Sequence, residues 1–292
     1  MMTTTPTTMT MEAPTKAGKS DLRRREAALR DRLSELPSLV VAYSGGVDSA
    51  YLAWAAHQVL GPRALAITAD SESYPERHRT MAKSVAARFG LPHEIIRTHE
   101  MDRPAYRANG PDRCYHCKHE LYSALTDLAR ARGFAAVADG NNADDRGDYR
   151  PGRKAAREFG VLSPLDAAGL TKADIRELSR EAGLECWDEP ASACLSSRIP
   201  YFSEVTDTKL RQIEQAETTI RGLGFRIVRV RHHGELARLE LARDEMLRAL
   251  EPAIADEIHT RLKALGFKFV ALDLNGYRTG SLNEAIILKQ IQ

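Results

Sequence analysis

Apolar positions along this chain fall into short runs separated by segments with helical spacing. The runs have the length of buried strands and cover residues 39–43, 64–69, 93–97 and 134–138. Between them apolar residues recur every three or four positions, as at 51–60 and 76–89. Strands and helices that alternate in this way favour right-handed parallel crossovers. The pattern therefore predicts an α/β fold with a doubly wound, Rossmann-type parallel sheet.

The pattern changes after Pro190, where residues 191–201 lack periodicity and are rich in small side chains. We place a domain junction near this point. The later elements are a helix, a hairpin, a helix and a strand, predicted at 207–221, around Gly234, at 243–265 and at 267–274. Three parts are expected: a disordered tail at 1–20, an α/β domain at 21–205 that opens with a charged helix, and a smaller C-terminal α+β domain at 206–292.

The first predicted strand and helix are joined by the sequence Ser44-Gly45-Gly46-Val47-Asp48-Ser49. A glycine turn at a helix N-terminus presents backbone N–H groups where the helix dipole favours an anion. Gly45 and Gly46 allow close approach of a phosphate, and the two serines add hydroxyl donors. Asp48 would repel a phosphate unless a divalent cation lies between them, so the loop predicts a nucleotide bound with Mg²⁺. The alternative is a turn that binds nothing.

Further polar side chains follow the carboxyl ends of predicted strands, where ligands bind in open α/β sheets. Asp70 follows the second strand, and Asn142, Asp144 and Asp145 follow the fourth. We expect Asp70 and Asn142 to contact the nucleotide and Asp145 to join Asp48 in holding Mg²⁺. For Asp144 and Asp145, a ribose contact or a plain turn are the alternatives.

Three of the four cysteines form a second candidate site. Cys114 and Cys117 are spaced C-x-x-C at the start of a predicted helix, and Cys194 lies in the junction segment. Three thiolates suit an iron–sulfur cluster with one open iron, whereas structural zinc prefers four ligands. Zinc and separate thiols, of which Cys194 alone matters, are the alternatives. Cys186 fits a packed core position better than a fourth ligand.

Basic and apolar side chains alternate at residues 226–231, so Arg229 and Arg231 project from one face of a strand. They form either an ordinary exposed face or a clamp for an anionic substrate. Glu217 and Glu240 are predicted to be solvated charges, although each lies near this basic strand.

Composition describes a globular protein of 292 residues with 43% hydrophobic and 28% charged residues. The net charge of +2 does not call for nucleic acid as a partner. No apolar run approaches the length of a membrane span, and the cysteine pattern is not that of a secreted disulfide framework, so the cytoplasm is the expected compartment.

Several motifs together resemble one known family. Residues 44–49 resemble the SGGxDS signature of the PP-loop ATP pyrophosphatases, a superfamily with a HUP-like Rossmann-type fold. With that signature, four further runs look like the LarE family: Asp139-Gly140-x-Asn142-x-Asp144-Asp145, Arg150-Pro151-Gly152-x-x-Ala155, Ser163-Pro164-Leu165 and Cys194-Leu195-x-Ser197-Arg198-Ile199-Pro200-Tyr201. The last of these discriminates far better than the PP-loop alone.

The resemblance implies an ATP-dependent sulfur transferase of nickel-pincer nucleotide cofactor biosynthesis. Its substrate would be pyridinium-3,5-biscarboxylic acid mononucleotide, whose carboxylates are adenylylated and converted to thiocarboxylates. Members with a lone cysteine at the position of Cys194 give up that sulfur, whereas Cys114 and Cys117 place this chain with members that bear a [4Fe-4S] cluster and take sulfide or another sulfur donor. The resemblance further implies that Arg229 and Arg231 receive the substrate phosphate, and that the protein is a homo-oligomer.

Other functions fit parts of the pattern. A tRNA thiolation enzyme also pairs a PP-loop with three cysteines, but it predicts a broad basic surface. An amidating ligase would leave the three thiols unexplained. A nucleotide-dependent redox sensor or scaffold would bind ATP without releasing pyrophosphate.

Overall fold

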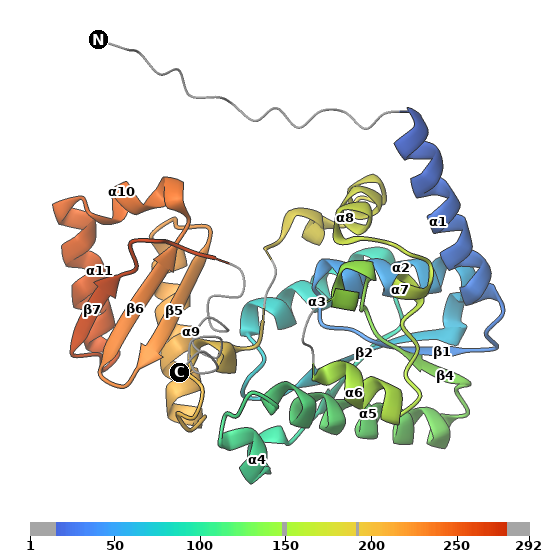
Figure 1. The fold of residues 1–292 in the computed structure, drawn as a ribbon, viewed down its shortest axis with the longest axis horizontal. Helices are drawn as coiled ribbons and strands as arrows, with labels where there is room; N and C mark the ends of the chain where they lie inside the picture. Colours follow the sequence, from blue (N-terminus) through green and yellow to red (C-terminus); the bar gives the residue numbers. More distant parts are fainter. Residues whose placement is uncertain (1–15, 148–150, 191–192, 279–292) are drawn as a thin grey trace.

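The structure, a computed structural model, describes residues 16–147, 151–190 and 193–278 (Figure 1). Its first sheet is fully parallel, with the strand order β3-β2-β1-β4. The strands are β1 (Leu39–Ala42), β2 (Ala64–Asp70), β3 (His93–Arg97) and β4 (Ala136–Ala138). The predicted α/β fold with a parallel sheet is confirmed.

Helices cover both faces of this sheet (Figure 1). One face carries α1 (Lys16–Ser34), α2 (Val47–Leu60), α3 (Glu76–Phe89), α7 (Pro164–Ala167) and α8 (Lys172–Glu181), and the other carries α5 (Arg113–Arg132) and α6 (Gly152–Glu158). Leu39 and Val41 of β1 pack into the first layer, while Val40 and Ala42 pack into the second. Because successive strand residues point to opposite faces, a strand covered on both sides is a continuous apolar run.

Local sequence signals fixed several helix ends. Helix α3 has the predicted bounds, and Gly90 and Gly133 close α3 and α5 in left-handed conformations. Thr171 and Asp174 form a capping box at the start of α8. Helix α1 begins at Lys16, five residues before the predicted start, and residues 1–15 of the predicted tail lie outside the described residues.

The second sheet has the order β5-β6-β7 and a core of its own. Strands β5 (Val228–His233) and β6 (Leu236–Leu241) form an antiparallel hairpin, and β7 (Phe269–Leu272) pairs with β6 in parallel. The helices α9 (Asp207–Gly222), α10 (Met246–Ala249) and α11 (Pro252–Ala264) accompany this sheet (Figure 1). Leu210 and Ile213 of α9 pack with Tyr106 and Leu195, whereas Ala216 and Ile220 pack in the second core, so α9 joins the two parts of the molecule.

One predicted segment differs from the structure. The single helix predicted at 243–265 is wrong: a short 3-10 turn at Arg243–Glu245 and α10 end before Glu251, whose extended backbone precedes Pro252 at the first turn of α11. Residues 100–113 contain the 3-10 turn η2 (Glu100–Asp102) and the short helix α4 (Pro104–Arg107). None of the helices in the described ranges combines the length and apolar character that crossing a membrane requires.

Candidate active site

The PP-loop, residues 44–49, connects β1 to α2 and is held by hydrogen bonds to the side chain of one of its serines. The backbone N–H of Ser44 donates to Oγ of Ser49 at 3.1 Å, and Oγ of Ser49 donates to the carbonyl of Gly46 at 3.1 Å. Gly46 caps α2 with an extended backbone and Asp48 lies in the first turn. The first N–H groups of any helix have no partner within the helix, so this turn can bind an anion.

Gly45 is required both by its backbone and by its surroundings. Its φ of +67° lies in the left-handed region, and a Cβ there would stand 3.0 Å from both Cβ of Ala82 and the carbonyl oxygen of His78 on α3. The loop therefore lies directly against α3.

Replacing Gly45 with alanine is expected to destabilise the fold by about 1–3 kcal/mol, because it adds backbone strain and a clash with α3. Urea unfolding measures this change. Gly46→Ala is the matched control, since Gly46 has a φ of −72° and a Cβ there would meet Oγ of Ser44 at 3.6 Å. Equal losses in the two variants would contradict the assignment.

The loop after β4 packs against the PP-loop. A Cβ on Gly140 would stand 2.9 Å from the backbone nitrogen of Ser49, so only glycine lets the two loops approach this closely. Asn142 donates its side-chain amide to Asp48 at 3.4 Å, and its backbone N–H donates to Oδ2 of Asp145 at 3.0 Å. These bonds bring together Asp48, Asn142 and Asp145. The three residues lie close because β1 and β4 are neighbours in the sheet and end at the same edge.

Asp70 ends β2 and is held by two arginines. Arg79 donates to it from Nε at 3.0 Å, and Arg97 donates to its other oxygen at 3.5 Å. The loop between β2 and α3 also contacts the PP-loop, because the hydroxyl of Tyr74 donates to the carbonyl of Ser44 at 3.0 Å. A nucleotide contact of Asp70 stays a prediction.

The segment that carries Cys194 is tied by hydrogen bonds to the loop before α3 and to the helices α4 and α5. Leu195 N–H donates to the carbonyl of Ser73 at 2.9 Å, and the hydroxyls of Tyr106 and Ser196 are 2.6 Å apart. Buried Arg113, the residue before Cys114, donates to the carbonyl of Ser196 at 2.9 Å. These bonds bring Cys194 to the first turn of α5.

The three thiols of Cys114, Cys117 and Cys194 lie close enough for their charges to act on one another. Burial raises the pKa of Cys117 well above its usual value, and Glu100 and Cys194 raise it further. Loss of hydration also raises the pKa of Cys114, against the effect of Arg113 and together with that of Cys194, although the residue as a whole is exposed. Within the described residues, no three His, Cys, Asp or Glu side chains form a group that could hold a metal ion.

Cys186 lies apart from these thiols in the core around α2 and α8. It is fully buried, and burial raises its pKa to about 11. The core interpretation of this residue is confirmed.

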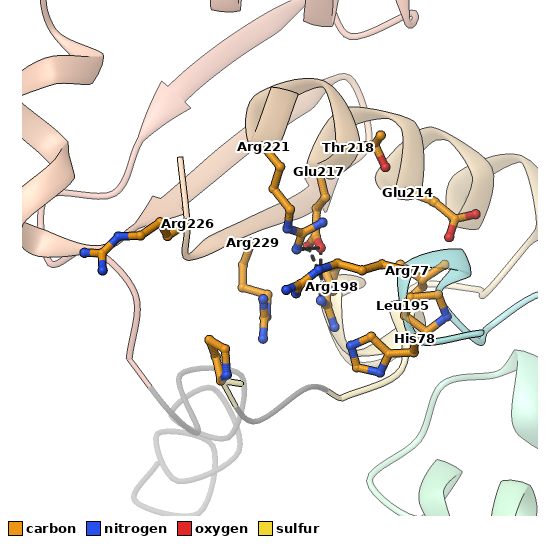
Figure 2. Close-up of a pocket in the computed structure, with 12 residues that line it drawn as sticks. Arg77, His78, Leu195, Arg198, Glu214, Glu217, Thr218, Arg221, Arg226 and Arg229 are labelled. Carbon is orange, nitrogen blue, oxygen red and sulfur yellow. Dashed lines mark hydrogen bonds and ion pairs between the residues drawn. The ribbon is translucent and has the colours of Figure 1, made fainter. Parts of the chain in front are cut away.

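A pocket rich in arginine lies beside Cys194, between the N-terminal end of α3, the 3-10 turn η5 (Leu195–Arg198) and α9 (Figure 2). Its centre is a buried ion cluster: Nε of Arg198 donates to Glu217 at 2.8 Å, and Arg221 donates to the same carboxylate at 2.8 Å. The backbone N–H of Val230 adds a further bond at 3.1 Å. Burial acts to raise the pKa of Glu217, but Arg198 and its neighbours outweigh burial and lower that pKa to about 2.

Arg229 and Arg231 are both 7% exposed. The alternative that they form an ordinary exposed strand face is therefore wrong. Glu217 and Glu240, predicted to be solvated, are 2% and 0% exposed, and that prediction is wrong as well. Arg229 lines the pocket, and burial together with Arg198 lowers its pKa to about 10. Arg231 donates to the carbonyl of Ser197 at 2.8 Å and to Glu240 at 2.7 Å.

Two functional residues of this pocket were not predicted from the sequence. Arg198 is the most deeply buried cation of the cluster. His78 faces the pocket from α3 (Figure 2), and burial with the nearby Arg77 lowers its pKa to about 4, so its imidazole is neutral near pH 7. The sequence does contain a signal for the carboxylate that Arg198 contacts: Glu217 and Arg221 are four residues apart on one helix, the spacing of an ion pair.

Comparisons with known proteins agree with this geometry. Residues 24–117 match the family model described as asparagine synthase. A protein of Synechocystis with no assigned function is 43% identical over 258 residues, 88% of this chain and 96% of that protein. A tRNA-specific 2-thiouridylase of Chloroflexus aggregans is 31% identical over 224 residues, 64% of this chain and 61% of that protein.

The most informative match is the pyridinium-3,5-bisthiocarboxylic acid mononucleotide synthase of Lactiplantibacillus plantarum. It is 37% identical over 271 residues, which are 92% of this chain and 98% of that protein. Identity at this level over nearly the full length of both chains shows that this protein belongs to the family of that synthase, the LarE family of PP-loop ATP pyrophosphatases.

Proposed function

We propose that this protein is an ATP-dependent sulfur transferase that converts the carboxylates of pyridinium-3,5-biscarboxylic acid mononucleotide to thiocarboxylates. The observation that carries the proposal is the meeting of three features around α3 and η5. The PP-loop lies against α3 at Gly45, His78 of α3 lines the arginine pocket, and Leu195 of that pocket adjoins Cys194. In this proposal the bound substrates lie between these three features.

The first half of the reaction activates a carboxylate. A carboxylate oxygen attacks the α-phosphorus of ATP, the bond to the pyrophosphate oxygen breaks, and pyrophosphate leaves. In this proposal the N–H groups of Gly45 and Gly46 bind the departing pyrophosphate, and Ser44 and Ser49 donate hydroxyls. Asp48 and Asp145 would hold Mg²⁺, since carboxylates are the ligands that this ion prefers.

The second half replaces AMP with sulfur. A sulfur nucleophile attacks the activated carbonyl carbon, the bond to AMP breaks, and a thiocarboxylate remains. The arginine pocket suits the substrate phosphate, because Arg229 lines it and supplies a positive charge.

Three thiols in one neighbourhood fit the ligand set of a [4Fe-4S] cluster with one open iron. Cys194 raises the pKa of both Cys114 and Cys117, so a cation that binds thiolates would relieve this repulsion. When bound by Cys114, Cys117 and Cys194, such a cluster would present hydrosulfide as the nucleophile without consuming the protein.

The alternative mode is a single turnover in which Cys194 attacks the activated carboxyl and then loses its sulfur, leaving dehydroalanine. It explains Cys194 but leaves Cys114 and Cys117 without a role. We place the reaction in the cytoplasm, where free thiols stay reduced, and we propose that the enzyme acts as a homo-oligomer.

One experiment tests this function against its rivals. Anaerobically purified protein is examined for iron–sulfur absorbance and then given ATP, Mg²⁺, sulfide and the pyridinium mononucleotide, while pyrophosphate and product mass are followed. We expect pyrophosphate and thiocarboxylate in equal amounts. Binding of ATP without pyrophosphate would indicate a sensor or scaffold, and thiolation of tRNA instead of the mononucleotide would indicate the tRNA enzyme.

Replacing Arg229 with glutamine is expected to raise the KM for the mononucleotide about tenfold or more, because a charge-assisted contact to its phosphate is lost. Steady-state kinetics with the mononucleotide varied and ATP saturating measures this. Arg226→Gln is the comparison, since Arg226 lines the same pocket but is exposed, points away from the cluster and pairs with Asp244 (Figure 2). A KM raised equally in both variants would contradict the role of Arg229.

A further inference from the structure

The loop between β2 and α3 contacts both the PP-loop and the segment that carries Cys194. The hydroxyl of Tyr74 donates to the carbonyl of Ser44 in the PP-loop at 3.0 Å. One residue earlier, the carbonyl of Ser73 accepts the backbone N–H of Leu195, the residue after Cys194, at 2.9 Å. Two adjacent residues of one short loop therefore hold the two segments that the proposed reaction must bring together.

A buried carboxylate, that of Glu100 in η2, holds this loop in place. Oγ of Ser71 donates to Oε1 of Glu100 at 2.5 Å, and Oγ of Ser73 donates to the same oxygen at 2.9 Å. All three residues are buried, and within the part of the chain that the structure describes Glu100 pairs with no lysine, arginine or histidine. The two hydroxyls therefore supply hydrogen bonds that a buried carboxylate without a cation requires.

A second contact fixes the Cys194 segment one residue farther along. The hydroxyl of Tyr106, in α4, lies 2.6 Å from the hydroxyl of Ser196, and both residues are fully buried. Helix α4 follows directly after the turn that contains Glu100. The two residues after Cys194 are thus held by the β2–α3 loop and by α4, on either side of η2.

We propose that Glu100 is a positioning residue that keeps the sulfur source in register with the activated carboxylate. This inference rests on the proposed function, in which the carboxylate is activated at the PP-loop and sulfur arrives from the segment that carries Cys194. If this segment is displaced, sulfur no longer lies within bonding distance of the carbonyl carbon of the adenylate. Water then attacks that carbon, the bond to AMP breaks, and the carboxylate is returned after pyrophosphate has already left.

The number of pyrophosphates released per thiocarboxylate formed measures this register. The full-length protein is assayed anaerobically with ATP, Mg²⁺, sulfide and the pyridinium mononucleotide. We expect a ratio near one in the wild type and a ratio raised about fivefold or more in Glu100→Leu, which leaves the hydroxyls of Ser71 and Ser73 without their acceptor. A loss of stability alone would reduce the amount of active protein and leave this ratio unchanged.

Glu100→Gln separates the hydrogen bonds from the charge. Glutamine keeps an oxygen that can accept from both serine hydroxyls, so the ratio should return to near one. It also removes the charge that acts on Cys117, as leucine does. A ratio raised equally by leucine and glutamine would assign the effect to that charge and overturn the inference. If Glu100→Leu does not fold, Ser73→Ala takes its place, because it removes only one of the two hydroxyls.

Tyr106→Phe tests the register from the other contact, since it removes only the hydroxyl that meets Ser196. This variant should also raise the ratio. Tyr51→Phe is the matched control, because Tyr51 is a buried tyrosine of α2 whose hydroxyl donates to Glu26 at 3.5 Å. A raised ratio in Tyr51→Phe, or a ratio near one in Tyr106→Phe or in the leucine variant, overturns the inference. If the wild type releases no pyrophosphate, the proposed function itself fails.

Discussion

Replacing Cys114 with alanine is expected to end multiple turnovers of sulfur transfer while ATP-dependent pyrophosphate release continues. The thiol of Cys114 is not among the described contacts of the PP-loop or the lining of the arginine pocket, so activation of the carboxylate should continue without it. Without one of three thiolates, catalytic delivery of sulfide is lost, and only the sulfur of Cys194 remains. The product should stop at about one thiocarboxylate per chain, with dehydroalanine at position 194.

Mass spectrometry of product and protein, carried out anaerobically with excess sulfide, checks this result. Cys186→Ala is the matched control, because it removes a thiol that lies in the core around α2 and α8. That variant should keep turning over. If Cys114→Ala continued past one equivalent per chain, the role proposed for the three cysteines would be wrong.

The parallel sheet could be predicted because its strands and the helix ends around it have local sequence signals. All four residues of β1 are buried, which requires an apolar run, and the turns after α3 and α5 need glycine in a left-handed conformation. The neighbourhood of Asp48 and Asp145 also followed from the sheet, since β1 and β4 are adjacent and end at the same edge.

The burial of Arg229 and Arg231 could not be predicted from the sequence. The alternation of side chains along a strand does not show which other elements cover that strand. Arg229 and Arg231 alternate with apolar residues as an exposed strand would, yet η5 and α9 cover them. The covering residues, among them Arg198 and Glu217, lie at least ten positions away in the chain. The break before Pro252 was missed for a local reason. The apolar spacing fits one continued helix, although a proline also fits the first turn of a new one.

Replacing Glu217 with glutamine is expected to produce the largest loss of stability, about 3–5 kcal/mol. Glu217 is 2% exposed and is the carboxylate that Arg198 and Arg221 share. Removal of its charge leaves buried guanidinium groups uncompensated, which costs more than the ion pair itself contributes. Urea unfolding followed by circular dichroism measures the change. Glu257→Gln, which breaks an exposed pair with Arg261 on α11, is the matched control and should lose a few tenths of a kcal/mol.

The same carboxylate gives the protein a specific response to acid. The pKa of Glu217 is lowered from 4.5 to about 2 on folding, against the effect of burial, by Arg198 and the arginines around it. A lowered folded-state pKa stabilises the protein above the unfolded-state value and loses that contribution as the pH falls through the folded-state value. The stability difference between the wild type and Glu217→Gln should therefore be constant near neutral pH and shrink between about pH 4.5 and pH 2. A difference that stayed constant over this range would mean that Glu217 is protonated with ordinary affinity, and that the arginine cluster does not hold it as a carboxylate.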